Sequence, residues 1–126
     1  MLKILIVGSG GFIGAASRYM LSVFINKLYS VSFPLSTLII NVLGSFLIGF
    51  LTQLFAHNYP DNKNMMIFLT TGVLGGFTTF STFSLETVNL FQNGSTLQAA
   101  LNMLLSIIFC LTGTFLGKLM AKTLIS

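Results

Sequence analysis

Four apolar stretches, each long enough to cross a lipid bilayer, occupy almost all of this 126-residue chain. They cover about Leu2–Ile25, Phe33–Phe55, Met65–Phe91 and Thr96–Lys122. A spanning helix needs roughly 20 mostly apolar residues to cross about 30 Å of hydrocarbon. The residues between the stretches are few, polar and rich in turn formers. The sequence therefore predicts an all-α integral membrane protein, with one domain of four transmembrane helices over residues 1–126.

Charge is too scarce for a soluble protein, because only 6% of the residues are charged and soluble globular proteins carry about 25%. Nucleic acid binding needs a clustered basic face, which this chain lacks, so we expect no nucleic-acid partner. The cations lie near the ends of the predicted spans, where basic residues anchor a helix at the membrane interface. They are Lys3, Arg18, Lys27, Lys63, Lys118 and Lys122. Four of these cations lie on the same side of the membrane as the termini and two lie on the opposite side. This weak bias leaves open whether the protein inserts in one fixed orientation or in both orientations.

The third stretch is interrupted by the segment Gly75-Gly76-Phe77-Thr78-Thr79-Phe80-Ser81-Thr82-Phe83-Ser84. Each glycine costs about 1 kcal/mol relative to alanine in a helix interior, and the Thr78-Thr79 pair is no better a helix former, so we expect the helix to unwind in this segment. A bilayer has no water for freed backbone groups, so protein must bury the break or a polar pathway must use it. Freed carbonyls bind cations and a new helix N-terminus favours anions. A kink packed against neighbouring helices is the alternative.

Aromatic and polar side chains near the break are further candidates. Phe80 and Phe83 are three residues apart and share a helical face, where their positive ring edges can contact a small dehydrated anion. Packing against neighbours or lipid is the alternative for these rings. The hydroxyls of Ser81 and Thr82 favour a pathway, since polar groups at membrane depth mark pathways or helix contacts. In the second stretch, Asn41 either ligates a permeating ion or forms a helix-to-helix hydrogen bond.

The fourth stretch carries a polar stripe of Asn102, Ser106 and Cys110 at four-residue intervals, continuing to Thr114. This stripe fits either a hydrated groove or helix packing. Four helices enclose little space, which favours a pathway formed between subunits. Glycine pairs four residues apart indicate close helix contacts. These pairs are Gly10 with Gly14, Gly72 with Gly76, and Gly113 with Gly117.

Arg18 and Glu86 are the only charged residues well inside the predicted spans. Arg18 caps the C-terminal end of its helix, extends to the interface, or draws anions into a vestibule. Glu86 lies two to three turns past the break, near a membrane boundary. No set of His, Cys, Asp or Glu has catalytic or metal-ligand spacing, so we expect no enzyme.

Together these residues resemble the Fluc (CrcB-type) family of fluoride channels over essentially the whole chain. The resemblance is carried by three motifs, of which the third is the most specific, although the family often has tyrosine at the position of Asn102. They are Gly11-Phe12-Ile13-Gly14-Ala15-Ala16-Ser17-Arg18-Tyr19, Asn41-Val42-Leu43-Gly44-Ser45-Phe46-Leu47-Ile48-Gly49 and Gly75-Gly76-Phe77-Thr78-Thr79-Phe80-Ser81-Thr82-Phe83-Ser84-Leu85-Glu86.

The resemblance implies an antiparallel, dual-topology homodimer in the cell inner membrane, with two fluoride pores related by symmetry. Export is passive: hydrogen fluoride enters the cell and dissociates, and fluoride leaves through the channel, which lowers its toxicity. A structural sodium ion would lie at the dimer centre on backbone carbonyls of Gly75 and Thr78 from both subunits. The implied fluoride pathway contains Asn41, Phe80, Phe83, Ser81, Thr82, Ser106 and Thr114, with Arg18 and Glu86 in the vestibule.

Two other functions fit the sequence less well. A small multidrug-type exporter needs an intramembrane carboxylate in its binding chamber, but the first stretch offers only Arg18 and Glu86 lies off the break. A non-transporting membrane assembly subunit would explain the glycines. It gives no reason for a Thr/Ser-rich break beside paired phenylalanines.

Overall fold

The computed structural model describes residues 1–126, which form helices joined by short connections. The first, second and fourth spans are the continuous helices α1 (Leu2–Leu28), α2 (Leu35–Asn58) and α6 (Thr96–Ile125). The third span is divided into α3 (Lys63–Ile67), the π-helical segment η1 (Phe68–Leu74), α4 (Gly75–Phe77) and α5 (Phe80–Gln92). By length and composition, four segments can cross a membrane: Leu2–Leu28, Leu35–Asn58, Lys63–Gln92 and Thr96–Ile125. The prediction of an all-α protein with a third helix broken near its middle is confirmed.

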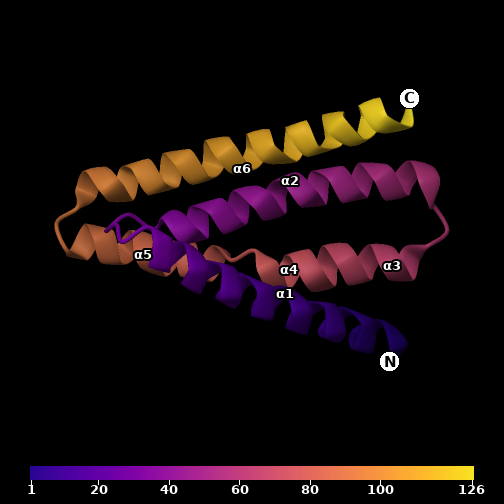
Figure 1. Cartoon of the computed structure of the whole chain (residues 1–126), viewed down its shortest axis with the longest axis horizontal. Helices are drawn as coiled ribbons and strands as arrows, with labels where there is room; N and C mark the ends of the chain where they lie inside the picture. Colours follow the sequence, from indigo (N-terminus) through magenta and orange to yellow (C-terminus); the bar gives the residue numbers. More distant parts are fainter.

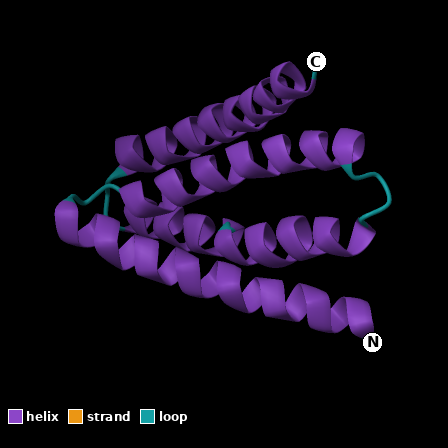
Figure 2. Ribbon diagram, turned by 45° about the vertical axis from the view of Figure 1, so that its right-hand side comes forward, coloured by secondary structure: helices purple, strands orange, loops and turns teal.

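The four spans lie side by side, with α2 between α6 and the third span (Figure 1). The most extensive helix contact joins α2 to α6, and α1 packs mainly against η1 and α4. Both termini lie at the same end of the molecule, as an even number of spans requires (Figure 1). Short loops join the helices, and a further non-helical segment interrupts the third span (Figure 2).

The second helix differs from the sequence-based prediction at both ends. Pro34, which lies inside the predicted span Phe33–Phe55, is the residue before the first helical residue. His57, which lies beyond the predicted end at Phe55, belongs to the last turn of α2, which continues to Asn58. The helix ends where Tyr59 precedes Pro60, because a proline disfavours helical geometry in the residue before it. The side chain of Asn62 then caps α3 by accepting a hydrogen bond from the Met65 N–H at 3.2 Å.

Glycines allow α1 to approach the third span backbone to backbone. A Cβ atom at Gly14 would overlap the carbonyl oxygen of Val73, and one at Gly10 would lie 3.0 Å from the Cα of Gly72. Opposite them, a Cβ at Gly76 would also meet the α1 backbone. The third pair, Gly113 and Gly117, packs in the same way against α2. The close contacts expected from the glycine spacing are therefore present, and all three pairs make them within one chain.

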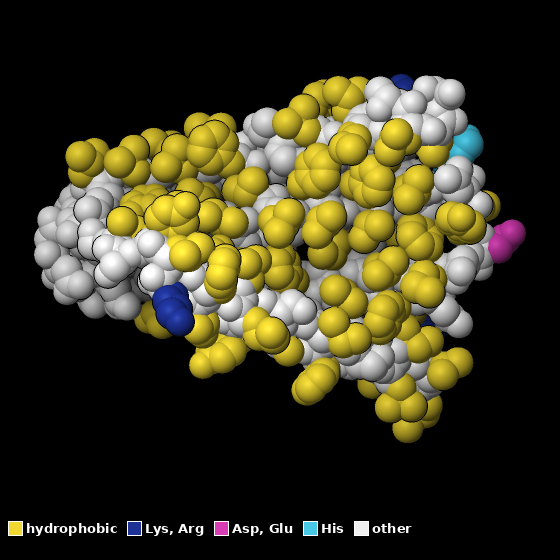
Figure 3. All heavy atoms as spheres, viewed as in Figure 1, with side chains coloured by type: hydrophobic (Ala, Val, Ile, Leu, Met, Phe, Trp, Pro, Cys, Tyr) yellow, Lys and Arg dark blue, Asp and Glu magenta, His cyan; other side chains and the backbone are white.

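The distribution of side chains is that of a protein surrounded by lipid. Large apolar residues cover the surface, and charged side chains lie toward the ends of the face in Figure 3. The interior contains several buried polar residues, including Thr37, Thr79, Thr87 and Asn102. A protein surrounded by hydrocarbon is expected to bury its polar side chains between helices and to turn its apolar side chains outward. The chain is a multi-pass membrane protein.

Candidate functional site

The third span leaves helical geometry at Thr78 and Thr79. Their backbone angles, φ −79° and ψ 158° for Thr78 and φ −150° and ψ 116° for Thr79, are extended. Gly75 and Gly76 belong to α4, so within the segment expected to unwind the glycines stay helical and the threonine pair leaves the helix. Gly76 serves packing instead, because a Cβ atom there would lie 2.5 Å from the carbonyl oxygen of Gly11 on α1. The two threonines after the glycines form the break.

Asn41 of α2 binds the backbone of the broken segment. Its Nδ2 atom donates a hydrogen bond to the Thr79 carbonyl at 3.0 Å, and its Oδ1 atom accepts one from the Thr79 N–H at 2.8 Å. One side-chain amide therefore satisfies both backbone polar groups of a buried, extended residue. The amide still has a second N–H, because an asparagine side chain carries two donors. Of the two roles left open by the sequence, helix-to-helix bonding is present.

Thr79 also caps the helix that follows it. Its hydroxyl oxygen accepts a hydrogen bond from the Thr82 N–H at 3.1 Å and donates to the Thr82 hydroxyl at 3.1 Å. The Ser81 hydroxyl lies 3.3 Å from the same atom. Thr79 was not assigned a role from the sequence, although threonine immediately before a helix is a favoured cap. Its hydroxyl engages Ser81 and Thr82, two of the predicted pathway residues.

These bonds release the carbonyl oxygens of Gly75 and Thr78. In an unbroken α-helix, each carbonyl accepts from the N–H four residues later. For Gly75 that donor is Thr79, whose N–H bonds Asn41 instead. For Thr78 it is Thr82, whose N–H bonds the Thr79 hydroxyl. Two backbone oxygens at the break are thereby deprived of their helical partners.

A cavity of about 430 Å³ adjoins the break, between α2, α5, α6 and the segments η1 and α4. It brings together six of the residues predicted to bind fluoride or sodium. They are Asn41, Gly75, Thr78, Phe80, Phe83 and Ser106. The lining contains no charged side chain. The cavity therefore offers amide, hydroxyl and carbonyl groups within a largely apolar wall.

The two phenylalanines of α5 lie against each other on the cavity wall. Their ring centroids are 5.4 Å apart and the ring planes are inclined at 49°. Phe83 is half-buried, whereas Phe80 is 79% exposed. The tilt prevents face-to-face stacking, and because each ring edge carries partial positive charge, edges rather than faces suit an anion.

The polar stripe of α6 is divided by the fold. Ser106 is buried in the cavity wall, and its hydroxyl oxygen has no hydrogen-bond partner within the chain. The half-buried Cys110 also lines the cavity. At either end, Asn102 donates to the Thr87 hydroxyl at 2.9 Å, and Thr114 donates to the Ser45 carbonyl at 3.0 Å. The middle of the stripe forms the groove, whereas its two ends connect helices.

Arg18 and Glu86 lie outside this cavity. One carboxylate oxygen of Glu86 accepts a hydrogen bond from the Thr37 hydroxyl at 2.9 Å. The other oxygen is buried without a partner. Thr37 was not identified from the sequence, where it is one hydroxyl residue in an apolar stretch. No group of three or more His, Cys, Asp or Glu residues could hold a metal ion, so a cation at the break would depend on backbone oxygens.

Comparison with known proteins identifies the family. The model of the CrcB-like protein family, Camphor Resistance (CrcB), matches residues 5–118. A protein of Ruminiclostridium cellulolyticum named fluoride-specific ion channel FluC is 63% identical over 126 residues, which cover 100% of this chain and 97% of that protein. A protein of the same name from Elusimicrobium minutum is 49% identical over 121 residues, with 95% and 94% covered. The family resemblance seen in the motifs is confirmed, and the chain belongs to the CrcB-like protein family.

Proposed function

We propose that this protein is a passive, fluoride-selective ion channel of the cell inner membrane that exports cytoplasmic fluoride. Relatives sharing 63% and 49% of its residues are named fluoride-specific ion channels. The observation that carries the proposal is the cavity at the helix break. One buried hydroxyl without a partner and two phenylalanine rings line it, and no charged side chain does.

Fluoride enters such a cavity only if protein groups replace its water. Ser106 has a buried hydroxyl with no partner, so its proton is free to bind an anion. Asn41 keeps one N–H after bonding Thr79. The edges of Phe80 and Phe83 add weak positive partial charges beside these donors. Because no full positive charge lines the cavity, the anion is stabilised without being trapped.

The lack of an acid in the cavity supports a channel over a proton-coupled exporter. Exchange of a cation for protons requires a carboxylate that both bind in turn. Glu86 lies outside the cavity, with one carboxylate oxygen bonded to Thr37. A drug–proton exporter would therefore lack its central acid at the break.

The open side of the cavity supports an antiparallel homodimer with two pores. Phe80 is 79% exposed and Leu111 is 68% exposed along this wall. Lipid cannot satisfy the polar backbone of a helix break, so another protein surface is expected to cover it. In the proposed assembly, Ser81, Thr82 and Thr114 extend the pathway beyond the cavity, and Arg18 and Glu86 lie in its vestibules.

The proposal includes a structural sodium ion at the dimer centre. Gly75 and Thr78 would hold it through their carbonyl oxygens, which have lost their helical donors to Asn41 and Thr79. Unwound backbone carbonyls of broken membrane helices are suited to sodium. The positive charge of the ion would balance the partial negative charge of these oxygens, and the ion would link the broken helices of the two subunits.

The direct test is anion efflux from liposomes containing the purified protein, followed with fluoride and chloride electrodes. Fast fluoride release without chloride release, and without a proton gradient, is the expected result. Absence of fluoride release from demonstrably folded protein would overturn the proposal. Proton-driven uptake of organic cations by the same liposomes would instead favour an exporter.

A further inference from the structure

A second cavity, of about 310 Å³, lies at the end of the molecule that holds both termini. Residues of α1, the end of α2, the following turn and the beginning of the third span line it. Its polar lining residues are Lys3, Asn62 and Lys63, and the others include Phe55, Tyr59 and Met66. The cavity is separate from the helix break and shares no lining residue with the cavity there.

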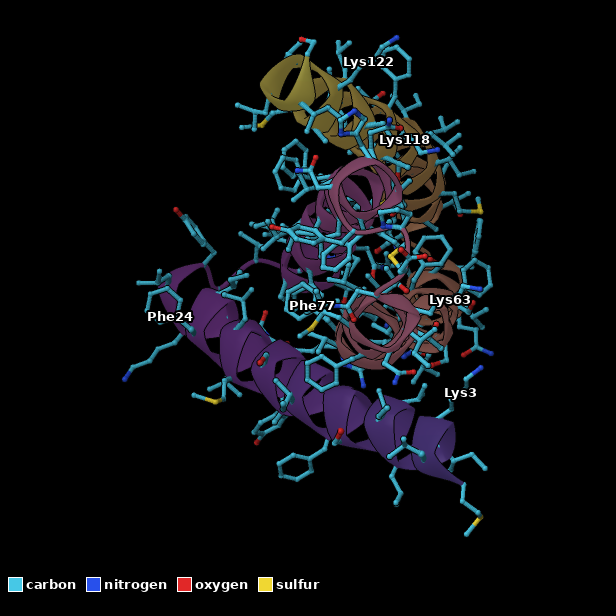
Figure 4. The ribbon with its side chains drawn as sticks, turned by 90° about the vertical axis from the view of Figure 1, so that its right-hand side faces the viewer. Lys3, Phe24, Lys63, Phe77, Lys118 and Lys122 are labelled. Carbon is cyan, nitrogen blue, oxygen red and sulfur yellow. The ribbon has the colours of Figure 1, made fainter.

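Two amines and no carboxylate line this cavity. Lys3 comes from the first turn of α1 and Lys63 from the first residue of α3, and both lie at the same end of the molecule (Figure 4). Asp61 is next to Asn62 in the chain but does not line the cavity. Asn62 uses its carbonyl oxygen to cap α3, which leaves its NH2 group as a donor. The polar side of the cavity thus suits an anion with several oxygen acceptors.

The opposite side of the cavity is apolar and aromatic. The ring centroids of Phe55 and Tyr59 lie 5.6 Å apart at the end of α2. Met66 and Ile67 extend the apolar lining along the third span. Tyrosines are enriched where membrane spans reach the headgroup region, and Tyr59 immediately follows α2. A ligand in this cavity would contact the two lysines on one side and apolar side chains on the other.

We propose that this cavity binds the headgroup of an anionic phospholipid. Lys3 and Lys63 bind the phosphate, the Asn62 amide donates to one of its oxygens, and the first acyl carbons contact Phe55 and Met66. Basic pockets between spans at a membrane surface bind anionic headgroups by such contacts. A free phosphate ion would use the same amines but leave the apolar wall unused. The site is independent of ion conduction.

The test compares lipid binding to two charge-matched variants by native mass spectrometry. Lys3→Gln/Lys63→Gln removes both amines of the cavity. Lys118→Gln/Lys122→Gln removes the same charge from the same end of the molecule, on α6 and outside the cavity (Figure 4). With added phosphatidylglycerol, we expect the first variant to bind about 25-fold more weakly than the unmodified protein, since each of the two lysines contributes roughly fivefold. The second should change by less than about threefold.

Equal losses in the two variants would overturn the proposal, because they would reflect only general charge. Complete displacement of phosphatidylglycerol by inorganic phosphate would overturn it in favour of a soluble anion. Lys3→Arg/Lys63→Arg keeps the charges and should retain binding. On the unmodified protein, phosphatidylglycerol should raise the melting temperature more than phosphatidylcholine does. Equal effects of the two lipids would contradict the site even if the glutamine variant failed to fold.

Discussion

Asn41 and Thr79, 38 residues apart in the chain, exchange two hydrogen bonds: the Asn41 side chain donates to the Thr79 carbonyl at 3.0 Å and accepts from the Thr79 N–H at 2.8 Å. This pair holds the broken third span to α2 and replaces both bonds that a helix would have supplied. It also draws the Thr79 N–H away from Gly75. The stability of the break and the availability of its carbonyls therefore depend on the same amide.

Asn41→Asp should weaken both folding and transport. Aspartate can accept from the Thr79 N–H but, when ionised, cannot donate to its carbonyl, and it places negative charge in the cavity. We expect a loss of about 1–3 kcal/mol in unfolding free energy, from an unpaired buried carbonyl, and at least a tenfold loss of fluoride efflux. Thermal unfolding and electrode measurements would check both effects. Asn89→Asp, on the exposed face of α5, is the matched control, and equal effects there would contradict the proposed role.

Phe80→Ile and Phe83→Ile should each reduce fluoride efflux sharply while leaving the protein folded. Isoleucine keeps an apolar side chain but has no ring edge to contact the anion. A loss of about tenfold would correspond to roughly 1.4 kcal/mol at the barrier. Phe115→Ile, at an outward position that is 66% exposed, supplies the matched control for liposome assays. Normal flux in both α5 variants would refute the role of the ring edges.

Ser106→Ala should separate conduction from stability. The serine hydroxyl is buried and has no partner within the chain, so its removal should leave folding unchanged or slightly stabilised. Fluoride efflux should fall because the cavity loses a donor. Ser9→Ala, which removes an exposed hydroxyl bonded to the Ile6 carbonyl, should leave efflux unchanged. A large drop in the melting temperature of Ser106→Ala without a change in flux would indicate a structural role only.

Sodium removal should destabilise the protein if the carbonyls of Gly75 and Thr78 bind this ion. Replacing sodium by N-methylglucamine at constant ionic strength should lower the melting temperature, since an ion at 100 times its Kd stabilises by about 2.7 kcal/mol. Thr79→Val should lower the melting temperature in either cation, because the Thr82 N–H then loses the hydroxyl that caps α5. An identical melting temperature in both cations would exclude the site.

Gly44→Ala should disturb the break from the side of α2. A Cβ atom at Gly44 would overlap the Cγ2 methyl of Thr78, so the extended segment must shift. We expect a cost of about 1–3 kcal/mol in unfolding free energy, together with reduced fluoride efflux. Gly8→Ala is the control, because nothing lies within 4 Å of its new methyl group. That change should be neutral or stabilise α1 by up to about 1 kcal/mol.

The sequence by itself determined the four spans, the interruption of the third and the family. Apolar length is decided locally, because hydrocarbon requires each span to satisfy its own backbone. The glycine spacing likewise indicated close helix contacts. It could not show that Gly14 meets Val73 of the same chain, since the small-residue pattern is the same for contacts within and between subunits.

The tertiary structure decided which residues form the break and which polar groups remain free. Gly75 and Gly76 stay helical, and Gly76 packs against α1. The extended residues are Thr78 and Thr79, and the polar groups of Thr79 find partners on Asn41 and Thr82. The stripe on α6 looked uniform, yet Ser106 lines the cavity while Asn102 and Thr114 bond neighbouring helices. Hydrogen bonds between distant segments made these distinctions, and residue spacing along one helix carries no information about such partners.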